Sequence, residues 1–116
     1  MTLEDVRKLL ECDVLTGGEL PGTAVEEGFA ADLMSEVLAY CRPRAVLLTG
    51  LATIQSVHTA DVSDLAAVVF VHGRKPLAEV VALAARRGIP LLSTPRSMFE
   101  ACGALHAAGI RPARKG

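Results

Sequence analysis

The chain contains no tryptophan, and only 3% of its 116 residues are aromatic. Its core must therefore be built from alanine, valine, leucine and isoleucine, and apolar residues do make up 51% of the chain. This apolar content excludes a disordered polypeptide, and the length fits one domain with one core. No apolar run approaches the roughly 18 residues that cross a bilayer.

An excess of charge of either sign is also missing, since 12 basic and 13 acidic residues give a formal net charge of −1. Bulk binding to nucleic acid or to an anionic membrane requires a basic surface, so we expect neither partner. The N-terminus, Met1–Asp5, is acidic and lacks the pattern of a signal peptide. We therefore expect a cytoplasmic protein.

The three cysteines, Cys12, Cys41 and Cys102, form no CxxC motif and no cluster with histidine. Reduced, mostly buried thiols are the expectation, and a redox switch or metal site is the alternative.

The motifs GxxxxGK(S/T), GxGxxG and GxSxG, which bind phosphate or dinucleotides or carry a nucleophilic serine, are all missing. No set of Asp, Glu and His residues has metal-ligand spacing. We therefore expect no catalytic residue, no metal and no cofactor.

Apolar patterning predicts helices that alternate with strands along the chain. Expected helices span 2–11, 32–41, 53–64, 76–88 and 97–108, and expected strands span 12–15, 23–28, 45–48, 67–71 and 89–92. This order predicts a single α/β domain, residues 1–110, whose mainly parallel sheet is flanked by helices. Residues 111–116 form a basic C-terminal tail that we expect to be frayed.

Local signals define the helix ends and faces. Thr2 and Ser97 each precede an acidic residue three positions later, which is the pattern of a capping box. Gly88 follows an apolar stripe and is expected to end the fourth helix. Apolar residues at helical spacing are expected to face the core. They are Leu3, Val6, Leu9, Leu10, Leu33, Val37, Leu38, Ile54, Val57, Val62, Leu77, Val80, Val81 and Ala84.

Three polar loops follow the last three expected strands. In open parallel sheets ligands bind beyond the carboxyl ends of the strands, so these loops are expected to gather at one rim. Their hydroxyls, glycines and cations, together with helix N-termini, suit an anionic ligand such as a nucleotide or a phosphate. The candidate ligand-binding residues are Thr49, Gly50, His72, Gly73, Arg74, Lys75, Ser93, Thr94 and Ser97.

Ordinary structural interpretations of these residues stay open. Gly73 can serve only as a turn, and Arg74 and Lys75 can be a solvated pair. His72 can be a surface histidine of a loop. The hydroxyl residues after the last strand can serve only to cap the final helix.

Residues 13–110 resemble the DRTGG domain family. The segments that carry the resemblance are Val14–Gly18, Ala31–Ser35, Ala67–Pro76, Arg87–Pro95 and Ser97–Glu100. The resemblance implies a helix-flanked α/β domain like the N-terminal domain of HPr kinase/phosphorylase. It also implies a homodimer, because domains of this family often form one. A regulatory or interaction role is implied as well, because family members occur beside CBS domains, in phosphotransacetylases and in some inorganic pyrophosphatases.

The chain departs from the residues that give this family its name. Leu51 and Ala52 follow Gly50 where the family has Asp-Arg, and Val71–Gly73 stands where it has Thr-Gly-Gly. Small stand-alone members resemble this chain in carrying a segment like Thr53–Gln55. Such members occur near iron-hydrogenase and redox genes, so the resemblance implies a redox-enzyme partner such as a hydrogenase.

Together these observations favour a non-catalytic regulatory or adaptor domain that forms a homodimer. It would bind a partner protein or a small anionic, nucleotide-like effector. One alternative is a small enzyme of phosphoryl or acyl transfer that uses His72, Arg74 and Ser93 as acid/base and anion clamp. Another is a structural subunit of a redox complex.

Overall fold

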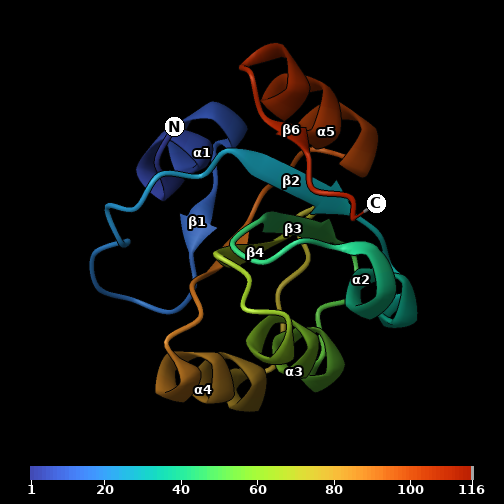
Figure 1. The fold of residues 1–116 in the computed structure, drawn as a ribbon. Coiled ribbons are helices and arrows are strands. Elements are labelled where there is room, and N and C mark those ends of the chain that lie inside the picture. Colours follow the sequence, from blue (N-terminus) through green and yellow to red (C-terminus); the bar gives the residue numbers. More distant parts are fainter. Residues whose placement is uncertain (116) are drawn as a thin grey trace.

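The computed structural model describes residues 1–115, which fold into a sheet covered by helices on both faces (Figure 1). The helices are α1 (Leu3–Leu10), α2 (Met34–Tyr40), α3 (Ile54–Val62), α4 (Ala78–Arg87) and α5 (Met98–Ala107). The strands are β1 (Asp13–Val14), β2 (Glu27–Ala30), β3 (Val46–Thr49), β4 (Ala67–Phe70), β5 (Leu91–Ser93) and β6 (Arg111–Pro112). Gly116 lies outside the described residues.

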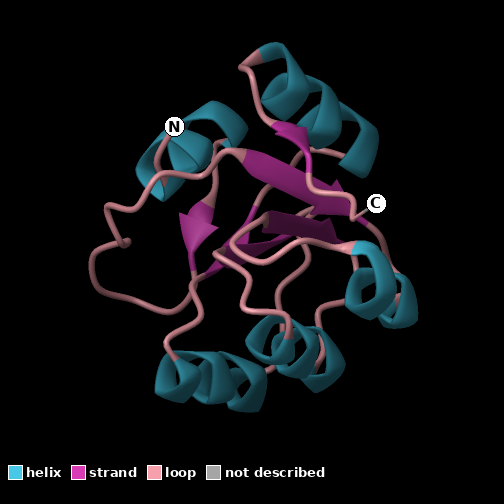
Figure 2. Cartoon of the chain, viewed as in Figure 1, coloured by secondary structure: helices cyan, strands magenta, loops and turns pink. Residues whose placement is uncertain are grey.

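The sheet has the order β1-β5-β4-β3-β2-β6. Neighbouring strands from β5 to β6 are parallel, and only β1 is antiparallel to its neighbour β5. Helices α2, α3 and α4 cover one face, and α1 and α5 cover the other (Figure 2). The expected single α/β domain with a mainly parallel sheet is therefore confirmed.

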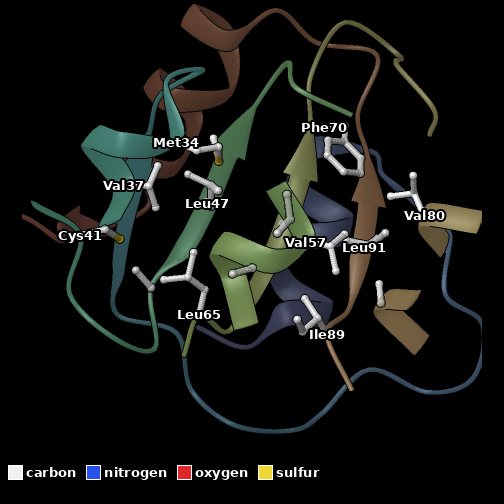
Figure 3. Packing of buried hydrophobic residues seen from close by; sticks show 14 of the residues in the cluster. Met34, Val37, Cys41, Leu47, Val57, Leu65, Phe70, Val80, Ile89 and Leu91 are labelled. Atoms are coloured by element: carbon white, nitrogen blue, oxygen red, sulfur yellow. The ribbon is translucent and has the colours of Figure 1, made fainter. Parts of the chain in front are cut away.

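The central strands β3 and β4 are buried along their whole length. Alternate side chains point to opposite faces of a strand. Leu47 and Phe70 accordingly pack against α2, α3 and α4 (Figure 3), whereas Leu48 and Val69 pack under α1 and α5. The continuous apolar runs in the sequence thus supply both layers of the core, which fixes the carboxyl ends of these strands at one edge.

The local signals for helix ends are confirmed. Thr2 and Ser97 both form complete capping boxes, and the Ser97 Oγ accepts a hydrogen bond of 3.1 Å from the Glu100 backbone N–H. Gly88 ends α4 with φ at 70°, a left-handed conformation that glycine adopts at little cost.

Four side chains expected in the core are instead exposed, namely Leu33, Leu38, Val62 and Leu77. Leu33 and Leu77 have extended backbones and precede their helices as N-caps. Helix α2 therefore begins two residues later than expected and turns Met34 and Val37 inward, which leaves Leu38 on the solvent side. Helix α4 likewise begins after Pro76 and not at it.

The expectation that the C-terminal segment is frayed is wrong for residues 111–115. Arg111 and Pro112 form β6, which pairs in parallel with β2. Ala113 is fully buried, and its N–H donates a 2.9 Å hydrogen bond to the Gly28 carbonyl. The Arg114 guanidinium lies 5.6 Å from the centre of the Tyr40 ring. This segment therefore closes the edge of the sheet that β2 would otherwise leave open.

Candidate functional site

The loops after β3, β4 and β5 are in direct contact. The Arg74 Nη1 donates a 3.1 Å hydrogen bond to the Gly50 carbonyl, and the Ser93 Oγ donates a 2.8 Å bond to the Arg74 carbonyl. The Gly73 N–H donates a 2.7 Å bond to the Thr94 carbonyl. We call this edge the strand-end rim; it comprises residues 31–32, 49–50, 72–75 and 93–97.

Asp32 belongs to this rim, although the sequence pattern placed it at the start of a helix. Its Oδ1 accepts a 2.7 Å hydrogen bond from the Gly50 N–H and a 3.1 Å bond from the hydroxyl of the buried Thr49. Its Oδ2 accepts none from residues 1–115. The one signal in the sequence that could have identified Asp32 is its position just beyond β2.

Arg74 is the rim cation that has no acidic partner among the described residues. Lys75 pairs with Asp13 at 3.2 Å, and Arg96 pairs with Glu11 at 3.2 Å. The Arg74 guanidinium, by contrast, is held only by the Gly50 carbonyl. Its remaining N–H groups are therefore available to an anion.

Gly50 allows Asp32 and Arg74 to approach the same point of the backbone. A Cβ at Gly50 would lie 3.4 Å from the Asp32 Oδ1 and 3.6 Å from the Arg74 Nη1. A carboxylate and a guanidinium thus flank one glycine without forming an ion pair. This arrangement offers an acceptor and a donor to a single small ligand.

His72 has a left-handed backbone with φ at 59°, which is uncommon for a residue that carries a Cβ. Its N–H donates a 2.8 Å hydrogen bond to the Arg96 carbonyl, which anchors this turn to the loop after β5. The imidazole is exposed and forms no hydrogen bond or ion pair with residues 1–115. The backbone of His72 therefore shapes the rim, while its ring is not oriented by a neighbour.

The remaining hydroxyl residues of the candidate set hold the rim together. Ser93 is engaged with Arg74, as described above. The buried Thr94 donates a 2.6 Å hydrogen bond to the Leu10 carbonyl, and Ser97 caps α5. Their hydroxyls are therefore used within the protein, and the buried Gly50 has its N–H and carbonyl bonded to Asp32 and Arg74. The accessible part of the set is His72, Gly73, Arg74 and Lys75.

Neither of the two cavities described lies at the rim. One cavity of about 410 Å³ lies between α5 and the β2–β6 edge, and one of about 190 Å³ lies between residues 16–21 and the end of α4.

Among residues 1–115, no three His, Cys, Asp or Glu side chains gather as a metal site. None of the helices described is long and apolar enough to span a membrane.

Comparisons with known proteins identify the fold. No protein-family model matches the chain, and no curated protein matches it. Four chains of solved structures do match. One is the CBS and DRTGG domains of the regulatory region of Clostridium perfringens pyrophosphatase, complexed with the activator diadenosine tetraphosphate. The likeness covers 97% of the present chain with a TM-score of 0.72.

The chain has a DRTGG-like fold. Because the sequence identity is 14%, the likeness shows the fold alone. The resemblance of residues 13–110 to the DRTGG domain is thus confirmed for the fold. The DRTGG-like domain corresponds to 48% of the clostridial chain, so it spans about half the length of that structure.

Proposed function

We propose that this DRTGG-like domain is a cytoplasmic, non-catalytic regulatory module that forms a homodimer. Its strand-end rim binds a small phosphate-containing, nucleotide-like effector. The observation that carries this proposal is the Arg74 guanidinium, which lies over Gly50 beside Asp32 and has no acidic partner among residues 1–115.

The free groups of the rim match the chemistry of a nucleotide. The Nε and Nη2 of Arg74 can donate to a phosphate, because a guanidinium presents paired N–H groups to such an anion. The Oδ2 of Asp32 can accept a hydrogen bond from a ribose hydroxyl. Gly50 has no side chain, so the Asp32 carboxylate and the Arg74 guanidinium approach the same buried stretch of backbone and can contact one ligand together.

The start of α3 adds backbone donors on the same side. Its N-cap, Thr53, makes no side-chain hydrogen bond to the first turn. The Ser56 N–H is bonded to the Thr53 carbonyl, and the N–H groups of Ile54 and Gln55 have no partner among residues 1–115. The first turn of α5 is instead satisfied by Ser97 and Glu100. The phosphate is therefore expected between Arg74 and the start of α3.

Two observations support a regulatory over a catalytic role. The Ser93 hydroxyl donates to a backbone carbonyl, and the His72 ring has no orienting partner among the described residues. A nucleophile and its base need mutual orientation. The clostridial neighbour is a regulatory region complexed with a dinucleoside tetraphosphate, which makes nucleotides the first ligands to test.

The test is a thermal-shift panel of inorganic phosphate, ADP, ATP and diadenosine tetraphosphate. We expect at least one nucleotide to raise the melting temperature of the wild type and to lose this effect in Arg74→Gln. Arg86→Gln, on the exposed end of α4, is the matched control and should respond as the wild type does. No shift with any nucleotide, or an equal shift in Arg74→Gln, would refute the effector site.

The proposal extends to a protein partner, for which a redox enzyme such as a hydrogenase is the expectation from the family resemblance. Affinity purification of the full chain from its own host, followed by mass spectrometry, tests this point. Recovery of the same redox enzyme with the wild type in independent preparations supports the partner. Its absence refutes the redox link and leaves the effector site standing.

A further inference from the structure

An apolar groove runs along α5 on the face opposite α2, α3 and α4. Its cavity measures about 410 Å³. Apolar side chains of β2, β3, α5 and the segment before β6 line it, among them Leu48, Phe99, Cys102 and Ile110. Helix α1 covers the other half of this face (Figure 1), so the groove is open along the β2–β6 edge.

Helix α5 also carries exposed apolar residues on its outward face, between the polar Glu100 and His106. Phe99 is 89% exposed, and Gly103 and Ala107, one and two turns farther along, are also exposed. A side chain as large and apolar as Phe99 is ordinarily covered, and here it stands beside an apolar groove. The outward face of α5 therefore combines an uncovered aromatic side chain with polar neighbours, as the surface of an interface does.

Gly103 has no role within the fold that would require a glycine. A Cβ at this position would meet nothing within 4 Å, and the backbone is helical. Glycine is nonetheless one of the least favourable residues in the interior of a helix. Its use here is explained if another backbone approaches α5 closely at Gly103.

Two polar side chains of α5 are placed to meet a second copy of the same helix. Glu100 and His106 are each exposed and each three residues from Gly103, on opposite sides of it. Two α5 helices that cross antiparallel at Gly103 would bring Glu100 of each copy toward His106 of the other. The imidazole can then donate to the Glu100 Oε2, because Oε1 already accepts from the Ser97 N–H. The antiparallel arrangement also brings helix ends of opposite partial charge together.

We propose that a second copy of this chain occupies the groove. The two copies form an isologous dimer in which the α5 helices pair antiparallel at Gly103. Each Phe99 then enters the groove of the other copy, close to the segment Ile110–Pro112. This inference specifies the face of the homodimer proposed above and does not depend on the effector site.

Native mass spectrometry and sedimentation velocity at micromolar concentration test this face. We expect the wild type to be dimeric. Gly103→Leu and Phe99→Ser should each raise the dimer dissociation constant by about tenfold or more. Val62→Ser, which removes a 76%-exposed side chain from α3 on the opposite layer, is the matched control and should leave the dimer intact.

The side chain added in Gly103→Leu points into open space, because a Cβ at Gly103 meets nothing within 4 Å. This variant should therefore retain the circular-dichroism spectrum and the cooperative melting of the wild type. A short bis-maleimide gives a second measurement, since Cys102 lies next to the crossing point. It should link two wild-type chains and should fail to link Cys102→Ser. Arg74→Gln should remain dimeric, which separates this test from that of the effector.

Three results would overturn the proposal. A monomeric wild type would exclude the dimer, and a dimer unaffected by both Gly103→Leu and Phe99→Ser would exclude this face. A monomer that carries a bound apolar small molecule would assign the groove to a ligand instead.

Discussion

The carboxylate of Asp32 accepts a 2.7 Å hydrogen bond from the backbone N–H of Gly50 and so joins the ends of β2 and β3. The same oxygen accepts a bond from the buried Thr49 hydroxyl. One exposed side chain therefore satisfies two groups that the turn after β3 would otherwise leave without a partner. Asp32 fixes the geometry of the rim even before any ligand is considered.

Asp32→Ala is expected to destabilise the fold by about 1–3 kcal/mol, because two donors lose a charged acceptor. Asp32→Asn should cost less, since the amide oxygen can still accept a hydrogen bond. Urea unfolding of the two variants beside the wild type measures this difference. Equal stability of Asp32→Ala and the wild type would show that solvent replaces the carboxylate without cost.

Two glycines are expected to respond to alanine in opposite directions. Gly88→Ala places a Cβ at a φ of 70° and should destabilise the fold by roughly 1 kcal/mol. Gly103→Ala adds a Cβ in open space on a helix and should stabilise the isolated chain by roughly 0.5–1 kcal/mol. Thermal unfolding at low protein concentration separates folding from association. A destabilised Gly103→Ala would contradict the geometry.

The fall in melting temperature at acidic pH should depend on Glu100. The backbone N–H and the hydroxyl of Ser97 hold the pKa of this carboxyl below its ordinary value. Because the folded pKa is lowered, the stabilisation is present above the ordinary pKa of 4.5 and is lost as the pH falls through the folded pKa. Glu100→Gln should therefore flatten the fall in melting temperature over this range. An unchanged slope would disprove the linkage.

The thiols are expected to react in a fixed order. Burial raises the pKa of both Cys12 and Cys41 to about 11, and both side chains are enclosed by the core. Cys102 is only partly buried. Brief alkylation of the native protein at mildly alkaline pH, read by peptide mass spectrometry, should modify Cys102 first. Modification of Cys41 at the same rate would indicate that the core opens readily.

The features that the sequence could predict are local ones. The Ser97 and Glu100 box depends on residues three positions apart, and the buried strands β3 and β4 are continuous apolar runs. The rim follows from these strands once they are parallel. Its contacts between Gly50, Arg74 and Ser93 therefore agree with the expectation that three loops gather at one edge.

Other features depend on contacts between distant parts of the chain. The role of Asp32 requires Gly50, eighteen residues later, to lie beside it. Strand β6 is two residues long and contains Pro112, so no periodic pattern marks it, and only the open edge of β2 orders it. The groove beside α5 arises because one face of the sheet has fewer helices than the other, which composition does not reveal.

Titration of the ¹⁵N-labelled chain with ADP, followed by heteronuclear NMR, tests the central claim that the strand-end rim binds a phosphate-containing effector. We predict shifts that saturate and that are concentrated at the amides of Gly50, Ile54, Gly73 and Arg74, and that vanish in Arg74→Gln. Shifts confined to residues of the α5 groove such as Gly103, or no shifts at millimolar ADP, would contradict the account.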